Sequence, residues 1–269
     1  MRKLHPRQVE KPWGRLALPA TFGTAGPRPI GEIWYEDETG SDDLPLLVKY
    51  IFTSERLSIQ VHPDDSAARA VGLPGGKEEI WYILDCEPDA RLGIGLTRPL
   101  SAEAFRAAAL DGSIEQWIDW KPVRPGDCYF IPAGTVHAIG AGIMLAEIQQ
   151  NVDVTYRLYD YGRPRDLHLD QGQAVSRLLP YDRPVIHAPL GQDVGMLSPP
   201  DAPFRLELRH WSAGETVPLP DADHIWFTPL DGNGTVNEAP WAKGDCWLLD
   251  SESRLRTEAP SSALLATMN

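Results

Sequence analysis

Gln60 and His62 are the first residues whose types and spacing could do chemistry. Apolar and polar residues alternate from position 57 to 62, and this period of two predicts a half-buried strand that ends at Pro63. Gln60 and His62 then share its polar face. A neutral imidazole beside an amide oxygen on a rigid strand is half of a metal site. Alone, the two residues are more simply explained as solvated side chains on a strand.

Two further segments could complete such a site. Glu79 begins the apolar run of residues 80–84, a predicted strand in which only one of Glu78 and Glu79 can face inward. Residues 126–137 read GDCYFIPAGTVH, a G-x5-P-x-G-x2-H pattern that resembles the second motif of the cupin superfamily. The resemblance implies metal ligands from one hairpin and a single His from the second motif. The implied set is Gln60, His62, Glu79 and His137, with Glu79 chosen by the family's register. These mixed nitrogen and oxygen donors suit zinc or another divalent metal.

Four longer segments resemble the short bacterial form of the type I mannose-6-phosphate isomerase family. They are KPWG at 11–14, PLLVKYIFTSERLSIQVHPDD at 45–65, GGKEEIWYIL at 75–84 and IPAGTVHAIGAGIMLAEIQQNVDVTYRLYDYGR at 131–163. Gln60 stands where most cupins carry a His, and this family shows the same departure. The resemblance, good over residues 9–175, implies reversible isomerisation of D-mannose 6-phosphate and D-fructose 6-phosphate. The reaction would pass through an enediol by proton transfer, with one metal per chain.

The resemblance also implies roles for residues outside the ligand set. Residues that match the family's sugar-phosphate pocket are Lys49, Lys77 and Arg157. With Glu147 and Trp13 added from their own positions, we predict Arg157, Glu147 and Lys77 as catalytic residues and Lys49, Lys77 and Trp13 as substrate-binding residues. We expect Arg157 to stabilise the enediolate or to hold the phosphate. We expect the base to be either Glu147, its pKa raised by an apolar strand, or Lys77, its pKa lowered by neighbouring cations.

Several of these residues have a structural alternative. Glu147 could instead be a buried ion-pair partner of Arg157, and Trp13 could belong to the core. Arg163 and Arg165 are expected in a solvated loop. The remaining histidines have no ligand-like spacing and are expected to be structural or solvated: His5, His168, His187, His210 and His224.

Composition limits the class of protein and its partners. The 269 residues carry a net charge of −13, which argues against nucleic acid or an anionic membrane surface as a partner. A phosphorylated sugar, the expected small-molecule partner, must therefore meet a local basic cluster. The sequence contains no run of 18 apolar residues, so it predicts no membrane-spanning helix. The three cysteines are isolated, and residues 1–7 lack an apolar leader segment, so we expect a cytoplasmic protein.

Many short apolar runs punctuated by 25 prolines and 23 glycines predict an all-β protein. The resemblance implies two cupin (jelly-roll) barrels, with a short helical insertion in the first. Helices are expected at 64–71, 101–110 and 114–118. Residues 243–250 echo residues 125–132, but Leu255 stands at the position equivalent to His137. We therefore expect a metal-binding domain at 1–180 and a smaller cupin-like domain without a metal site at 181–269.

Two other functions fit the same residues. One is another metal-dependent cupin that acts on sugars, either an isomerase for a different sugar or a redox enzyme. The other is a sugar-phosphate sensor that keeps the pocket without turnover. An amide ligand argues against the redox alternative, because non-haem iron oxygenases favour two His and one carboxylate with open positions.

Overall fold

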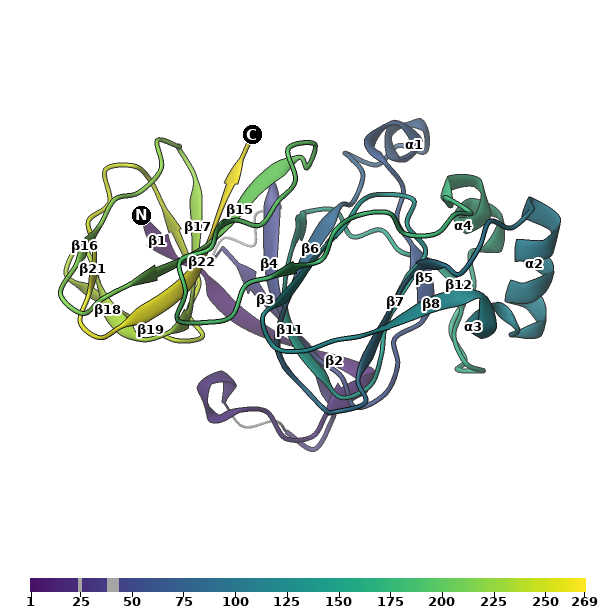
Figure 1. Cartoon of the computed structure of the whole chain (residues 1–269), viewed down its shortest axis with the longest axis horizontal. Coiled ribbons are helices and arrows are strands. Elements are labelled where there is room, and N and C mark those ends of the chain that lie inside the picture. Colours follow the sequence, from purple (N-terminus) through teal and green to yellow (C-terminus); the bar gives the residue numbers. More distant parts are fainter. Residues whose placement is uncertain (24–25, 38–43) are drawn as a thin grey trace.

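The computed structural model describes residues 1–23, 26–37 and 44–269. The described chain is mostly β, as predicted, and its four sheets follow one another along the long axis of the molecule (Figure 1). From one end to the other, the order is helices, a five-stranded sheet, a seven-stranded sheet, a six-stranded sheet and a four-stranded sheet.

The first two sheets enclose the region of the predicted site. In spatial order, the five-stranded sheet contains β12 (Tyr156–Tyr159), β5 (Ile59–Val61), β10 (His137–Ile139), β7 (Arg91–Leu96) and β8 (Ile118–Pro122). The seven-stranded sheet contains β13 (Ile186–His187), β9 (Asp127–Ile131), β6 (Glu79–Cys86), β11 (Ile143–Gln150), β4 (Leu46–Phe52), β3 (Ile30–Glu36) and β2 (His5–Arg15). Ile94 and Ile139 of the first sheet pack with Trp81 and Leu145 of the second in one buried cluster. This cluster fixes the strands that carry the site.

The C-terminal third supplies the other two sheets. The six-stranded sheet contains β1 (Arg2–Lys3), β20 (Trp247–Leu249), β17 (Ile225–Asp231), β22 (Ser261–Met268), β15 (Phe204–Trp211) and β14 (Gly195–Met196). The four-stranded sheet contains β16 (Thr216–Val217), β21 (Leu255–Thr257), β18 (Asn233–Val236) and β19 (Ala239–Ala242). Leu255 is fully buried in the core between them.

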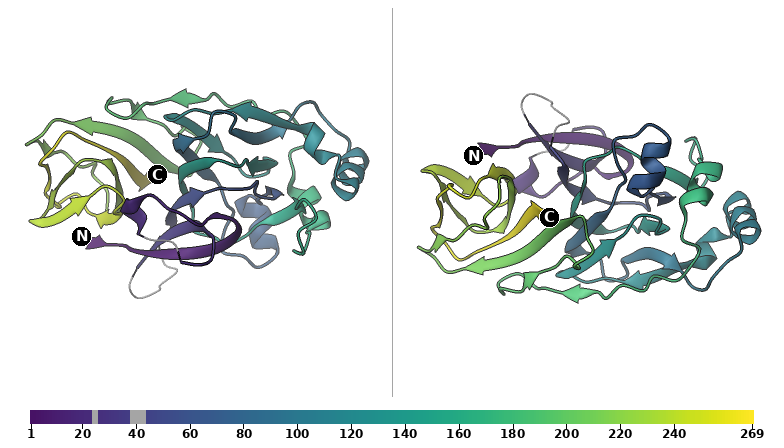
Figure 2. Two further views of the ribbon diagram at one scale, coloured as in Figure 1. Left: turned by 90° about the horizontal axis from the view of Figure 1, so that it is seen from below. Right: turned by 90° about the horizontal axis from the view of Figure 1, so that it is seen from above.

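Two short strands cross the expected division at residue 180. β1 pairs with β20 of the six-stranded sheet, and β13 pairs with β9 of the seven-stranded sheet. A single apolar cluster also joins the facing sides of these two sheets, with Tyr50 and Ile148 on one side and Leu206 and Leu264 on the other. The two halves of the chain are therefore in close contact, and Figure 2 shows the N-terminal strand reaching the C-terminal sheets.

The helices lie at the outer face of the five-stranded sheet (Figure 1). They are α2 (Ala102–Asp111), α3 (Ile114–Trp117) and α4 (Leu169–Val175), while α1 (Asp65–Ala70) follows β5 and a 3-10 turn covers Ala20–Phe22. The Ser101 hydroxyl accepts a hydrogen bond from the amide of Ala104 at the start of α2, and Gly112 ends it in the left-handed conformation. α4 was not predicted. No helix in the described part of the chain is long and apolar enough to cross a membrane.

Candidate active site

Three predicted site residues lie in register on the five-stranded sheet. Gln60 of β5 is opposite His137 on β10 and opposite Arg157 on β12. Directly opposed residues of an antiparallel pair point to the same face, so these three side chains share one face. His62 follows β5 by one residue, on the same alternation as Gln60.

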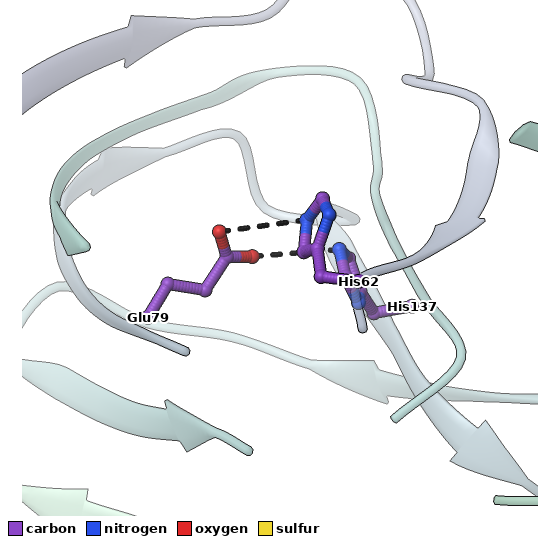
Figure 3. A group of neighbouring side chains, drawn as sticks. All are labelled: His62, Glu79 and His137. Carbon is purple, nitrogen blue, oxygen red and sulfur yellow. Dashed lines mark ion pairs between the residues drawn. The ribbon is translucent and has the colours of Figure 1, made fainter. Parts of the chain in front are cut away.

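Glu79 reaches the two histidines from the facing sheet. It is the first residue of β6, and its carboxylate oxygens lie 3.7 Å from His62 Nε2 and 3.4 Å from His137 Nε2 (Figure 3). One ligand atom from each residue falls within 4.8 Å of the others. All three residues are buried. Glu78 points elsewhere, because its Oε1 accepts a hydrogen bond from the amide of Ala133.

Backbone carbonyls fix both imidazoles in the form that binds metals. Nδ1 of His62 lies 2.7 Å from the carbonyl of Val154, and Nδ1 of His137 lies 2.8 Å from that of Thr135. Each Nδ1 must therefore carry the proton that it donates, which leaves the Nε2 lone pair for a ligand. His62 Nε2 and both oxygens of Glu79 are buried without a hydrogen-bond partner, although Lys77 Nζ forms an ion pair of 3.4 Å with Glu79 Oε2. Such orphaned atoms are costly unless a further group satisfies them, so the residues fit a bound cation.

Burial dominates the pKa values of the three residues. It lowers the pKa of His137 to about 4 and that of His62 well below its usual value, with Lys77 acting in the same direction. Both histidines are therefore neutral near pH 7. Burial and then the charge of Glu147 raise the pKa of Glu79 to about 7, against the opposing effect of Lys77. A divalent cation would favour the ionised carboxylate.

The Gln60 amide touches the same group. Its Nε2 lies 3.3 Å from His137 Nε2, and its Oε1 accepts a hydrogen bond of 3.0 Å from Ser58. A half-turn of the amide would exchange the two atoms and present the oxygen to the histidine side. Gln60 is therefore placed to act as a fourth ligand.

A pocket lies beside this group, and Gln60, which contacts His137, lines it together with Lys77 and Trp81. Within the described residues, its charged lining consists of the cations Lys11, Lys49, Lys77, Arg157 and Arg165 and the carboxylates Glu32, Glu147 and Asp153. Cations thus outnumber carboxylates in the pocket of a chain whose net charge is −13. The local charge favours an anionic ligand.

The structure gives Glu147 a different ion-pair partner from the one predicted. We expected Arg157 as the buried alternative, but Lys49 lies opposite Glu147 in register, and Lys49 Nζ is 3.1 Å from Glu147 Oε1. Trp81 Nε1 donates a hydrogen bond of 2.9 Å to the other carboxylate oxygen. Lys49 Nζ also donates to the side chain of Gln149. Lys49 is thus a fully engaged buried cation.

The expected pKa directions for the two candidate bases are wrong. Burial would raise the pKa of Glu147, but Lys49 and Lys77, with hydrogen bonds from Lys49 and Trp81, outweigh burial and lower it. Burial would lower the pKa of Lys77, but Glu79 and Glu147 outweigh it and raise the pKa. Lys77 Nζ lies 3.4 Å from Glu79 Oε2. Near neutral pH, Glu147 is therefore a carboxylate and Lys77 an ammonium.

The prediction of a solvated loop for Arg163 and Arg165 is also wrong. Both form ion pairs with Asp160, whose side chain is only 2 % exposed. Arg163 turns away to the Arg56 carbonyl, whereas Arg165 lines the pocket with Arg157. Arg157 donates to the carbonyl of Asp166 at 3.4 Å.

Trp13 belongs to the core, as its structural alternative predicted, and its substrate-binding role stays a prediction. It is 2 % exposed and packs in the cluster between the two sheets, yet it also lines the pocket. His168 and His187 have structural contacts, to the amide of Arg157 and to the side chain of Asp127 respectively.

Known proteins resemble this chain in sequence and in fold. No family model matches the sequence. The mannose-6-phosphate isomerase ManA of Bacillus subtilis is 43% identical over 159 residues, which are 54% of this chain and 50% of that protein. A crystal structure of the mannose 6-phosphate isomerase from Bacillus subtilis superposes with a TM-score of 0.85 at 26% identity, over 99% of both chains. This chain is related to the mannose-6-phosphate isomerases.

The extent of that relationship differs between sequence and fold. In sequence, the chain spans about half the length of the curated isomerases that it matches. In fold, a zinc-bound mannose 6-phosphate isomerase aligns over 100% of this chain with a TM-score of 0.71, at 14% identity. The fold of the isomerases therefore extends beyond the segment that is recognisable by sequence.

Comparison of the site with the sequence prediction shows which pocket residues sequence reasoning missed. They are Lys11, Glu32, Trp34, Ile51, Leu57, Ser58, Trp81, Ile139, Asp153 and Thr155, together with Asp160, which forms an ion pair with Arg165. Trp34 had a usable signal, because it lies in register with Lys49 on the neighbouring strand.

Proposed function

We propose that this protein is a metal-dependent aldose–ketose isomerase that interconverts D-mannose 6-phosphate and D-fructose 6-phosphate through an enediol. One observation carries the proposal: a buried His–Glu–His group with orphaned ligand atoms lies beside a pocket rich in cations. This combination suits a polyhydroxylated, anionic ligand at a divalent metal. The sugar itself is taken from the names of the related isomerases.

The proposed cofactor is zinc, or another divalent metal, at one ion per chain. His62, Glu79 and His137 would hold it, with Gln60 as the fourth ligand, and a set of two imidazoles with oxygen donors suits zinc. When bound, the ion would act as a Lewis acid on the sugar oxygens.

The proposed chemistry assigns roles to four charged residues of the pocket. Glu147, held ionised by Lys49 and Lys77, is the base that moves a proton between C1 and C2. Lys77 remains an ammonium and, with Arg157, stabilises the negative charge of the enediolate. Lys49 and Trp13 shape the substrate side of the pocket.

For the fold, we propose two cupin-type barrels, each formed by two of the four sheets. The seven- and five-stranded sheets, without β13, would form the metal-binding domain at residues 1–180, whose β1 reaches across to the six-stranded sheet. The six- and four-stranded sheets would form the smaller domain, at residues 181–269. Two apolar clusters, one inside each pair of sheets, support this division.

Isotope exchange tests the reaction and its base. Mannose 6-phosphate incubated with the metal-loaded protein in heavy water should yield fructose 6-phosphate, with deuterium entering at C1 or C2. Glu147→Gln should lose both conversion and exchange while still binding metal. If Glu147→Gln exchanges at the normal rate and Lys77→Met does not, Lys77 is the base. Absence of any ketose product from the metal-loaded protein would refute the proposed activity.

A further inference from the structure

We propose that Arg165 binds the phosphate group of the substrate and that buried Asp160 positions it. This assignment rests on the proposed function, because it names the group that recognises the anionic end of the sugar. It separates two roles that the sequence left together at Arg157, namely phosphate binding and stabilisation of the enediolate.

The carboxylate of Asp160 forms ion pairs with two arginines and holds them in place. Its side chain is 2 % exposed and follows β12 by one residue. Oδ2 accepts a bond of 2.6 Å from Arg165 Nε, and Oδ1 accepts one of 2.7 Å from Arg165 Nη2. Oδ1 also accepts a hydrogen bond of 3.1 Å from Arg163 Nη1. A buried carboxylate with bidentate contacts holds a guanidinium in one orientation.

The contact with Asp160 leaves the end of the Arg165 fork free. A guanidinium has five N–H donors, and Asp160 takes one from Nε and one from Nη2. No other side-chain hydrogen bond of Arg165 occurs among the described residues. Three donors remain, and one N–H of Nη1 with one N–H of Nη2 forms the planar edge that matches two phosphate oxygens. Arg165 is 25% exposed and lines the pocket.

Arg157 lies on β12, whereas Arg165 lies on the loop that follows this strand. Arg157 is opposite Gln60 in register, which places it beside the proposed metal ligands. Arg165 lies on the loop after β12, and this loop folds back on the strand: the His168 amide donates to the Arg157 carbonyl at 2.7 Å, and Arg157 Nη1 donates to the Asp166 carbonyl. In this proposal Arg157, opposite Gln60, serves the reacting carbons, and Arg165 serves the phosphate.

The other pocket cations are less available for a phosphate group. Lys49 and Lys77 are buried in ion pairs with Glu147 and Glu79. Lys11 lies 3.4 Å from Glu32. Arg165 also has a carboxylate partner, but its planar fork leaves a second edge free, which a lysine ammonium does not offer. We therefore place the phosphate at Arg165.

Arg163 provides a matched control for the test. It shares the loop and the Asp160 carboxylate with Arg165, but its Nη2 donates to the Arg56 carbonyl and pairs with Glu55, away from the pocket lining. Arg165→Gln should raise KM for mannose 6-phosphate by about tenfold to hundredfold, the effect of losing a charged hydrogen-bond pair. kcat should change little. Arg163→Gln should leave both constants nearly unchanged, and Asp160→Asn should reproduce the KM defect of Arg165→Gln.

A binding measurement separates failure of this assignment from failure of the proposed function. Inorganic phosphate is titrated calorimetrically into the metal-loaded wild type, Arg165→Gln and Arg163→Gln. Binding that is weakened only in Arg165→Gln supports the anion site even if the wild type does not turn over mannose 6-phosphate. Equal KM values for wild type and Arg165→Gln would overturn it. So would an equal loss of phosphate affinity in the two arginine variants, which would make the Asp160 cluster purely structural.

Discussion

Lys49 and Glu147 face each other across β4 and β11, and their buried side chains form an ion pair of 3.1 Å. Removing one partner leaves the other charge buried without compensation. We expect Lys49→Met or Glu147→Gln to lower the free energy of unfolding by about 3 to 5 kcal/mol. Urea denaturation at pH 7, with equal metal loading, measures this. The double variant should recover much of the loss, whereas additive losses would show that the two side chains are not coupled.

The same pair predicts how stability depends on pH. Because the pKa of Glu147 is below its usual value of 4.5 in the folded protein, its ionised form stabilises the fold above that value. The stabilisation is then lost as the pH falls through the lower, folded-state pKa. Unfolding free energy measured between pH 7 and pH 3 should therefore fall less steeply in Glu147→Gln than in wild type. Parallel profiles for the two proteins would argue against an ionised Glu147.

Metal binding should release protons in a defined pH range. In the metal-free protein the pKa of Glu79 is raised to about 7, while His137 titrates near 4. At pH 6 the ion displaces about one proton, from Glu79, and at pH 8 close to none. Affinity should accordingly rise up to about pH 7 and then level off. Calorimetry in buffers of different ionisation enthalpy counts the protons, and equal release at pH 6 and pH 8 would contradict this account.

Loss of a ligand should remove the metal but keep the fold. Glu79→Gln and His137→Ala each break the buried group, yet their strands remain paired and packed against the apolar cluster between the two sheets. We expect metal content and isomerase activity to fall together, with an unchanged far-UV circular dichroism spectrum. Ser58→Ala, beside Gln60 but outside the ligand group, is a control that should retain metal. Unfolding of either ligand variant would show that the metal is structural.

Arg157→Lys should impair turnover far more than stability. Lysine keeps the charge but loses the planar fork of donors. We expect kcat/KM to fall by at least about tenfold, equivalent to about 1.4 kcal/mol of transition-state stabilisation. The free energy of unfolding should change by less than about 0.5 kcal/mol, because Arg157 lies at a partly exposed position. Arg163→Lys is the matched substitution, and equal activity of both variants with wild type would make Arg157 merely structural.

Local sequence patterns predicted much of the secondary structure. The strand predicted at 80–84 lies within β6, and the helix expected at 101–110 differs from α2 by one residue at each end. Helix α4 was missed because its segment, LDQGQAV, contains a central glycine, which weakens a helical pattern. Gly172 packs closely against Leu158 and Tyr156, and a larger residue would not fit there, since a Cβ on Gly172 would come within 2.6 Å of the Leu158 side chain.

The site was predictable as a set of residues but not as a set of contacts. His62 and His137 were found because they occur in motifs, and the structure brings them to Glu79. The partner of Glu147 was not found, because strand pairing between β4 and β11 joins residues 98 positions apart. The pKa of Glu147 was predicted in the wrong direction for the same reason, since Lys49 supplies the charge that outweighs burial at Glu147. Nothing in the sequence indicates that Asp160 holds Arg165, because this role depends on burial of its carboxylate.

Reconstitution of the metal-free protein with zinc tests the central claim most directly. Mannose 6-phosphate turnover, followed by a coupled assay, is measured as zinc is added in known amounts to chelator-treated protein. Since the described chain places one His–Glu–His group in its ligand-forming geometry, activity should be absent without metal, rise linearly and reach a plateau at one zinc per chain. Full turnover in the metal-free protein, or none at saturating zinc, would contradict the proposal of a metal-dependent mannose-6-phosphate isomerase.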